Sequence, residues 1–189
     1  MLSLASAEAK KKNKGISRKQ LGKIAKQVGL GAIKFWMLNT GPDKVIVFDP
    51  KKAASFDENS GPYVQYAYTR ACSILSKSKG TKKREKVATT LKSITGAMGM
   101  LKEEKELALI RLLNEFPDTV ELAAKNMHPH VIAGYASRLA MAFNDFYETV
   151  PVLKADDDTK KARLVLVDAV RTVLKNSLRL LGMDAPEKM

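Results

Sequence analysis

Helical periodicity over almost the whole of the 189-residue chain is the feature that most limits its fold. Between residues 159 and 181, apolar side chains recur every three or four positions, as on the buried face of a helix. The stretch from Pro129 to Val150 carries a second such stripe. Only residues 44–50 (KVIVFDP) resemble a strand, and a solitary strand cannot form a sheet. We therefore predict an all-α protein whose C-terminal half is an antiparallel helical bundle, preceded by a smaller helical segment.

Capping residues, prolines and glycines divide the chain into predicted helices. Ser17 and Gln20 have the spacing of a capping box, which predicts a helix running to Val28, and Gly29 and Gly31 then interrupt the pattern. A polar, basic linker divides the chain into a unit over 1–80 and a bundle over 81–189. Further helices are expected over 62–76, 85–98, 103–115, 117–127 (opened by Pro117), 129–150 (opened by Pro129) and 159–181, with Gly182 as the last stop.

The positive charge of the chain is large and clustered. The 33 lysines and arginines outnumber the 20 acidic residues, which gives a net charge of +13 and a pI near 9.8. Residues 10–26 carry many basic side chains and no acidic one, and residues 77–86 hold a second cluster. Such clusters suit either a solvated surface or the binding of a polyanion such as a nucleic acid, and charge alone favours neither.

The residue types that carry metal or catalytic chemistry are sparse. The single cysteine, Cys72, has no histidine or other base nearby in the sequence and is predicted to pack in the interior. His128 and His130 lack a third ligand, so no metal site is expected. The acidic run 156–158 precedes a helix, where carboxylates cap free N–H groups. We find no phosphate-binding loop, no catalytic triad and no apolar run of roughly 20 residues, and therefore predict neither an active site nor a membrane span.

The segment GPYVQYAYTR (61–70) gathers aromatic and polar side chains on a predicted helix. Residues spaced by three and four share a helix face, and here they are Tyr63, Tyr66 and Arg70. Gln65 and Tyr68 point elsewhere. The tyrosines either pack a hydrophobic interior or form a platform on which nucleic-acid bases stack, and spacing favours the two equally. Asn144 and Tyr147, on a later helix, present the same alternative.

Four blocks of the chain, in order, resemble consecutive segments of the C-terminal part of arginyl-tRNA synthetases, which are class I enzymes. The resemblance is to the archaeal-like members of this family. The blocks are residues 28–38 (VGLGAIKFWML), 45–75, 135–153 and 162–189. In the last block, Asp168-Ala169-Val170-Arg171 is similar to the D-A-L-R signature of the family's anticodon-binding domain, with Val170 in the place of leucine. The resemblance implies a DALR-type anticodon-binding helical bundle at 81–189. Residues 1–80 are then the end of the catalytic or stem-contact region.

The resemblance also implies a function, namely docking of the anticodon stem-loop of arginine tRNA. The candidate RNA-binding residues are Tyr63, Gln65, Tyr66, Arg70, Arg138, Asn144, Tyr147 and Met189. Contacts to phosphates alone are predicted for Arg138, Lys19, Lys23 and Lys26. Asp168 and Arg171 are expected to fix the geometry of the bundle instead of touching a ligand.

The H-x-G-H and K-M-S-K-S-like motifs with which class I synthetases bind ATP are absent from the chain. We therefore expect a fragment of arginine–tRNA ligase that is inactive by itself, with ATP and Mg²⁺ needed in the parent enzyme and no cofactor here. Its expected partners are arginine tRNA and the catalytic domain of the same cytoplasmic enzyme, without DNA or a membrane. The alternatives are a stand-alone, non-enzymatic RNA-binding helical protein and a protein-interaction module.

Overall fold

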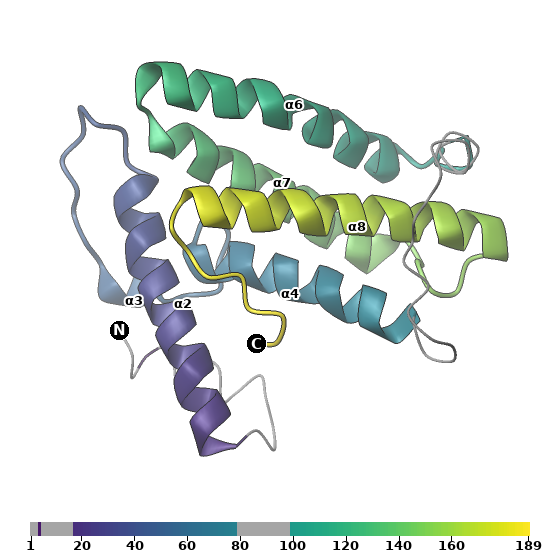
Figure 1. Cartoon of the computed structure of the whole chain (residues 1–189), viewed down its shortest axis with the longest axis horizontal. Helices are drawn as coiled ribbons and strands as arrows, with labels where there is room; N and C mark the ends of the chain where they lie inside the picture. Colours follow the sequence, from purple (N-terminus) through teal and green to yellow (C-terminus); the bar gives the residue numbers. More distant parts are fainter. Residues whose placement is uncertain (1–3, 5–16, 79–98) are drawn as a thin grey trace.

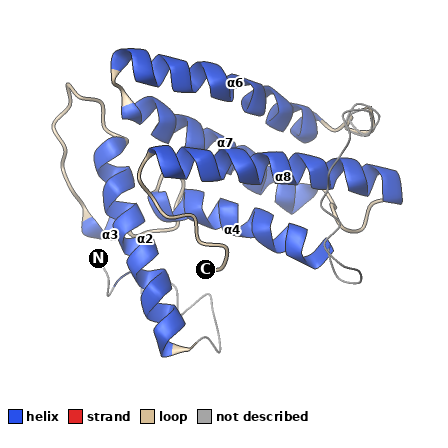
Figure 2. Cartoon of the chain, viewed as in Figure 1, coloured by secondary structure: helices blue, strands red, loops and turns tan. Residues whose placement is uncertain are grey.

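The computed structural model describes residues 4, 17–78 and 99–189, and within these ranges the chain forms helices and loops without a strand (Figure 2). The labelled helices are α2 (Arg18–Leu38), α3 (Pro50–Ala53), α4 (Gly61–Ser78), α6 (Glu104–Asn126), α7 (Pro129–Thr149) and α8 (Asp157–Leu180). The predicted all-α class is confirmed for this part of the chain. The expected helix at 85–98, half of the basic residues of the first cluster, most of the second cluster and the predicted boundary near residue 80 lie outside the described residues.

Four helices, α4, α6, α7 and α8, run side by side as a bundle, and α2 crosses them at one end (Figure 1). The helix α8 lies against the other three and buries one stripe of apolar side chains among them. This stripe consists of Leu166, Val167, Val170, Leu174 and Leu178. Fully buried Leu109 on α6 and Phe143 on α7 belong to the same core, so these helices share one continuous apolar interior.

Several predicted helix boundaries are confirmed. Ser17 caps α2, since its hydroxyl oxygen accepts a hydrogen bond from the backbone N–H of Gln20. Pro62 lies in the first turn of α4, and Pro129 is the first residue of α7, where the missing N–H costs nothing. Gly182 follows α8 with a positive φ of 63°, a conformation that favours glycine.

The prediction that α2 ends near Val28 is wrong, because the helix continues to Leu38 through both glycines. Gly29 and Gly31 are both buried in the helix interior. A Cβ atom added to Gly31 would lie 2.8 Å from the side-chain amide of Gln65 on α4. Gly31 therefore serves the close crossing of α2 and α4, and this tertiary contact outweighs its low helix propensity.

The predicted break at Pro117 is also wrong, since α6 is a single helix from Glu104 to Asn126 with this proline inside it. A proline in a helix removes one hydrogen bond and costs about 3 kcal/mol. On either side of it, Leu113, Phe116 and Val120 pack against the same bundle core. Burial of one continuous apolar face thus holds the two halves of α6 in line.

The strand-like run 44–50 forms no strand. Residues 45–48 instead belong to the loop that joins α2 to α3, and their side chains are exposed. The loop ends at Asp49, whose carboxylate accepts hydrogen bonds from the N–H groups of Lys51 and Lys52 and caps α3. The part of the chain that the structure describes contains no neighbouring strand with which this run could pair.

The buried carboxylate of Glu106 connects the N-terminal part of α6 to the N-terminal part of α8. Glu106 is fully buried, and its Oε2 accepts hydrogen bonds from the backbone N–H groups of Lys102 and Glu103. Its Oε1 accepts a 2.6 Å hydrogen bond from Nε of Arg163 on α8. Arg163 also donates to the carbonyl of Pro151 in the loop between α7 and α8. The carboxylate therefore holds three segments together without leaving a charge unpaired.

Replacing Glu106 by glutamine is expected to lower the free energy of unfolding by about 3–5 kcal/mol, because Arg163 would keep a buried charge without its partner. The matched control is Glu104→Gln, two residues earlier in the same helix, whose pair with Arg111 is exposed on both sides. This control should change stability by about 0.5 kcal/mol or less. Chemical denaturation of both variants measures the difference, and equal effects would contradict the structural role of Glu106.

Candidate nucleic-acid interface

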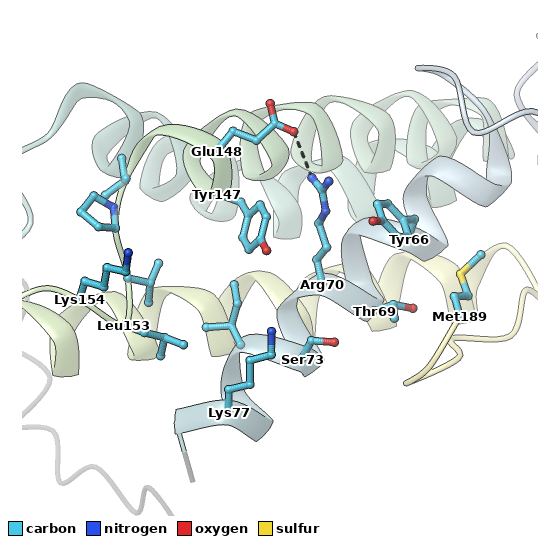
Figure 3. Close-up of a pocket in the computed structure, with 14 residues that line it drawn as sticks. Tyr66, Thr69, Arg70, Ser73, Lys77, Tyr147, Glu148, Leu153, Lys154 and Met189 are labelled. Carbon is cyan, nitrogen blue, oxygen red and sulfur yellow. Dashed lines mark hydrogen bonds and ion pairs between the residues drawn. The ribbon is translucent and has the colours of Figure 1, made fainter. Parts of the chain in front are cut away.

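An open groove of about 720 Å³ lies between α4, the end of α7 and the C-terminal tail (Figure 3). Its walls come from segments far apart in the sequence. The residues that line it include Tyr66, Thr69, Arg70, Ser73 and Lys77 from α4, Tyr147 and Glu148 from α7, Leu153 and Lys154 from the following loop, and Met189. Four of the sequence-predicted RNA-binding residues thus meet in one place. They are Tyr66, Arg70, Tyr147 and Met189.

The side chain of Arg70 is held between two aromatic rings. The guanidinium carbon lies 4.8 Å from the ring centroid of Tyr66 and 4.7 Å from that of Tyr147. Each contact is a cation–π interaction, which stabilises the charge and keeps the planar group flat against the rings. Because Tyr66 and Arg70 lie on α4 and Tyr147 on α7, this stack couples the two helices along one wall of the groove.

Two polar side chains of α7 fix the direction of the Arg70 guanidinium. Its Nη1 donates a 2.9 Å hydrogen bond to Oδ1 of Asn144 and lies 3.4 Å from Oε1 of Glu148 (Figure 3). Asn144 is only 7% exposed, so it contributes by positioning Arg70 more than by presenting its own surface. Asn144 also lines a second, smaller hollow together with Tyr63 and Met141.

The charge of the groove is mainly positive. Arg70, Lys77 and Lys154 line it, and among the described residues Glu148 is the one acidic side chain in the lining. The Glu148 side chain is 63% exposed, so its interaction with Arg70 is screened by solvent and can be displaced at low cost. An anion that enters the groove therefore meets three cationic side chains, and it competes with the exposed carboxylate of Glu148 for Arg70.

Gln65 lies in the interior, outside the groove lining, and its contact with RNA stays a prediction. Gln65 is fully buried, and its Nε2 donates hydrogen bonds to the carbonyls of Gln27 on α2 and Asp184 in the C-terminal tail, at 3.3 and 2.8 Å. The spacing on α4 predicted that Gln65 lies on a different face from Tyr66. In the structure, that face of α4 packs against α2. Gln65 is thus a structural link between three segments.

Tyr68 and Cys72 belong to the packed interior, as predicted. Tyr68 is 1% exposed and Cys72 packs against the same apolar cluster. Burial raises the pKa of Tyr68 to about 12, and burial also raises the pKa of the Cys72 thiol. Both groups therefore stay protonated at neutral pH, and a protonated, partly buried thiol is a poor nucleophile.

The C-terminal tail is held against α2 and α4. In addition to the bond from Gln65, the hydroxyl of Thr69 donates a 2.7 Å hydrogen bond to the carbonyl of Pro186, and the ammonium of Lys34 donates to the carbonyl of Gly182. Met189 then packs with Ile24 and Val28 of α2 in a small apolar cluster that Tyr66 also contacts. The tail thereby brings the terminal methionine to the end of the aromatic wall.

The remaining predicted contacts lie outside the groove lining. Lys19, Lys23 and Lys26 are exposed on α2, on the side opposite to buried Ile24 and Ala25. Arg138 on α7 forms an exposed ion pair with Glu115 of α6. Phosphate contacts by these four cations therefore stay predictions. Asp168 and Arg171 form an ion pair within one turn of α8, which is compatible with the structural role expected of them.

Sequence reasoning did not single out the other ten residues that line the groove, four of which are Thr69, Lys77, Glu148 and Lys154. Lys77 was counted only as part of a basic cluster, and Thr69 and Glu148 are helical residues without a distinguishing pattern. Lys154 follows Pro151 in the loop, so its approach to α4 depends on tertiary structure. The one available signal was spacing: Thr69 is three residues after Tyr66, and Lys77 is seven after Arg70, which places each near that face of α4.

Residues 4, 17–78 and 99–189 contain neither a metal-binding cluster nor a membrane-spanning helix. Among the described residues, His, Cys, Asp and Glu side chains form no cluster of three or more that could hold a metal ion. No described helix combines the length and apolar character needed to cross a bilayer.

Residues 64–189 match the family model described as "DALR anticodon binding domain". The chain therefore belongs to the family of DALR anticodon-binding domains. Its relatives include the arginine–tRNA ligases of Pyrococcus abyssi, 43% identical over 180 residues, and Pyrococcus furiosus, 40% identical over 186 residues. These matches cover 94% and 98% of this chain, but 27% and 29% of the relatives.

A solved structure, that of Thermus thermophilus arginyl-tRNA synthetase, matches the whole of this chain with a TM-score of 0.86 and 34% identity. The match covers 31% of that protein, so the chain spans less than a third of the length of all three relatives. The resemblance to arginyl-tRNA synthetases found in the sequence is confirmed, as is the helical fold that it implied.

The crossing of α2 and α4 generates a prediction about two glycines of the same helix. Gly31→Ala is expected to destabilise the protein by about 1–2 kcal/mol, because the new methyl group would collide with the pinned amide of Gln65. Gly22→Ala has open space around it and should stabilise α2 by about 0.5–1 kcal/mol. Denaturant unfolding of both variants is the measurement, and a stabilised Gly31→Ala variant would contradict the close crossing.

Proposed function

We propose that this chain is the anticodon-binding, C-terminal part of an arginine–tRNA ligase and that its groove receives the anticodon loop of arginine tRNA. The observation that carries the proposal is the stack of Arg70 between Tyr66 and Tyr147 at an open, positively charged groove. Membership in the anticodon-binding family and the similarity to arginine–tRNA ligases support it. Recognition of unpaired bases next to phosphates would account for both the aromatic rings and the positive charge of the groove.

In the proposed complex, Tyr147 and Tyr66 provide surfaces on which splayed anticodon bases stack. Tyr147 is 41% exposed, so part of its ring is open to a ligand before any rearrangement. Met189 extends the same wall with a flexible apolar side chain that adapts to a base face. Stacking of this kind tolerates any base and supplies affinity.

The cations of the groove hold the loop by its phosphates. Arg70 offers a planar fork of N–H donors suited to a phosphate, and Asn144 keeps it oriented from the interior. Lys77 and Lys154 add charge without directional preference. Entry of a phosphate displaces Glu148 from Arg70, which exchanges a screened ion pair for a bond to the ligand.

Arginylation itself is assigned to the part of the enzyme outside this chain. ATP and Mg²⁺ are proposed to act there, because this chain holds neither of the ATP-binding motifs of class I synthetases. The chain contributes by positioning arginine tRNA so that its acceptor end reaches the catalytic domain of the same cytoplasmic enzyme. Proximity of this kind increases the rate by fixing the reacting groups relative to each other.

Anticodon recognition is tested by binding of this chain to two RNA hairpins, the anticodon stem-loop of an arginine tRNA and the same stem-loop with its three anticodon bases replaced. We expect the first to bind at least about tenfold more tightly, since a lost base contact costs about 1–3 kcal/mol. Fluorescence anisotropy at several salt concentrations measures both affinities. Equal affinities would reduce the interaction to electrostatic attachment and refute the proposal.

The role of the aromatic wall is tested by Tyr147→Ala and Tyr147→Phe. The alanine variant should bind the arginine stem-loop roughly fivefold to 150-fold more weakly, which corresponds to a lost stack of about 1–3 kcal/mol. The phenylalanine variant keeps the ring and should retain most of the affinity. Thermal unfolding should change little in either, because Tyr147 is exposed at the rim. Unchanged binding by the alanine variant would exclude stacking at this site.

A further inference from the structure

The second hollow, beside the groove, differs from it in charge. It measures about 530 Å³, within the range of small-ligand sites, and lies between the start of α4 and the second half of α7. Its lining consists of Glu58, Tyr63, Met141, Ala142, Asn144, Asp145 and Glu148. Among these described residues three are acidic and none is basic, whereas cations predominate in the groove. A phosphate is therefore disfavoured in this hollow.

Asn144 presents an unused hydrogen-bond donor to the hollow. Its Oδ1 accepts the 2.9 Å hydrogen bond from Arg70, which fixes the orientation of the amide. None of the described residues accepts a hydrogen bond from its Nδ2. Only 7% of Asn144 is exposed, yet Nδ2 is not one of the buried atoms without a partner, so it reaches the surface where Asn144 lines the hollow. An almost buried N–H group of this kind is stabilised by a ligand that accepts from it.

Glu58 presents the opposite kind of group. Its carboxylate forms no ion pair or hydrogen bond within the described part of the chain. The other two carboxylates are already paired, that of Asp145 with Lys105 at 2.7 Å. That of Glu148 is paired with Arg70 (Figure 3). Because an ionised carboxylate only accepts hydrogen bonds, a ligand that satisfies both free groups must itself carry an acceptor and a donor.

The Watson–Crick edge of an unpaired base carries this combination, since it places N–H donors next to ring-nitrogen or carbonyl acceptors. A flat ring also suits the walls of the hollow. Tyr63 offers an aromatic ring that packs against the core, and Met141, 40% exposed, offers an adaptable apolar side chain. A cationic amine or a metal ion brings no acceptor for the amide of Asn144, and a phosphate diester brings no donor for Glu58.

We propose that this hollow, which we call the base pocket, receives one unpaired base of the RNA whose phosphates bind in the groove. Nδ2 of Asn144 donates to an acceptor on the edge of the base, the carboxylate of Glu58 accepts from a donor on that edge, and the base lies against Tyr63. The inference rests on the proposed function, because it takes the anticodon loop as that RNA.

The base pocket and the groove are neighbours and share a wall. Glu148 lines both, and Arg70 bonds both Glu148 and Asn144. A loop whose phosphate is bound by Arg70 therefore has an adjacent base at the mouth of the pocket. The amide of Asn144 serves both sites in one orientation, because its oxygen holds the guanidinium and its nitrogen binds the base.

The role of Glu58 is tested by Glu58→Ala, with the adjacent and exposed Asp57→Ala as the matched control. Both variants remove one negative charge, so electrostatics alone predicts slightly tighter binding of RNA by each. The base pocket predicts that Glu58→Ala binds the arginine anticodon stem-loop at least about fivefold more weakly, because a hydrogen bond to a charged group is lost. Asp57→Ala should bind it as well as the unaltered chain or slightly better. Fluorescence anisotropy measures these affinities.

The base that enters the pocket is identified with stem-loops in which each loop nucleotide in turn is made abasic. At one position the abasic RNA should bind the unaltered chain at least about tenfold more weakly, and Glu58→Ala should then cause no further loss. Asn144→Asp keeps the oxygen that holds Arg70 but replaces the N–H donor by an acceptor. It should weaken binding of the intact loop and leave binding of that abasic loop unchanged. Thermal unfolding verifies that both variants are folded.

Two results would overturn the inference. Unchanged or tighter binding by Glu58→Ala, matching Asp57→Ala, would show that Glu58 acts only through its charge. Losses in Glu58→Ala that are equal for the intact loop and for every abasic loop would show that no base enters the pocket. Either result can occur while the unaltered chain still distinguishes the arginine stem-loop from its anticodon-replaced form. Failure of the base pocket is therefore separable from failure of the proposed function, which equal affinities for those two hairpins would show.

Discussion

The buried amide of Gln65 is the contact on which the arrangement of the groove depends. It lies where α2 and α4 cross, and its Nε2 bridges a carbonyl of α2 to a carbonyl of the C-terminal tail. The crossing is close because Gly31 leaves no side chain in the way, and Gly61 at the start of α4 allows the backbone of Gly31 to approach. The contact acts together with the hydrogen bonds from Thr69 to Pro186 and from Lys34 to Gly182, which hold the tail on either side of Asp184.

The same contact determines what surrounds Tyr66. A tail held at Asp184 and Pro186 can place Met189 between Ile24 and Val28 of α2. Met189 in turn lies beside Tyr66, whose ring packs on Arg70. A chain of neighbouring contacts therefore leads from a buried glutamine to the exposed cation of the groove, and the groove is built from tertiary contacts instead of one helix face.

Sequence patterns predicted what depends on neighbours in the chain. Ser17, Pro129 and Gly182 act within one helical turn, and the i, i+4 spacing of Tyr66 and Arg70 placed both in the groove. Patterns failed where a distant segment decides the outcome. Gly31 looked like a helix stop because its contact, Gln65, is 34 positions away, and the burial of Gln65 against α2 could not be predicted from spacing for the same reason.

The misjudged proline and the misjudged strand have a common physical origin. Local propensity opposes a helix at Pro117 and favours a strand at residues 45–48, yet the opposite is observed in each case. The apolar face of α6 finds a complete partner in the bundle, which outweighs the cost of the proline. Residues 45–48 contact Trp36 and have no strand beside them in the described part of the chain, so no ladder forms there. Whether a segment forms a helix or a strand therefore depends on its packing partner as well as on its local propensity.

The helix α2 joins the two surfaces that face outward from the bundle. Its N-terminal half contacts Met189 through Ile24 and Val28, and its C-terminal half contacts residues 45–48 through Trp36. At 1.5 Å per residue, its 21 residues span about 31 Å, and buried Gly31 ties that span to α4. The contacts of the loop and the contacts beside the groove are therefore made by the same helix.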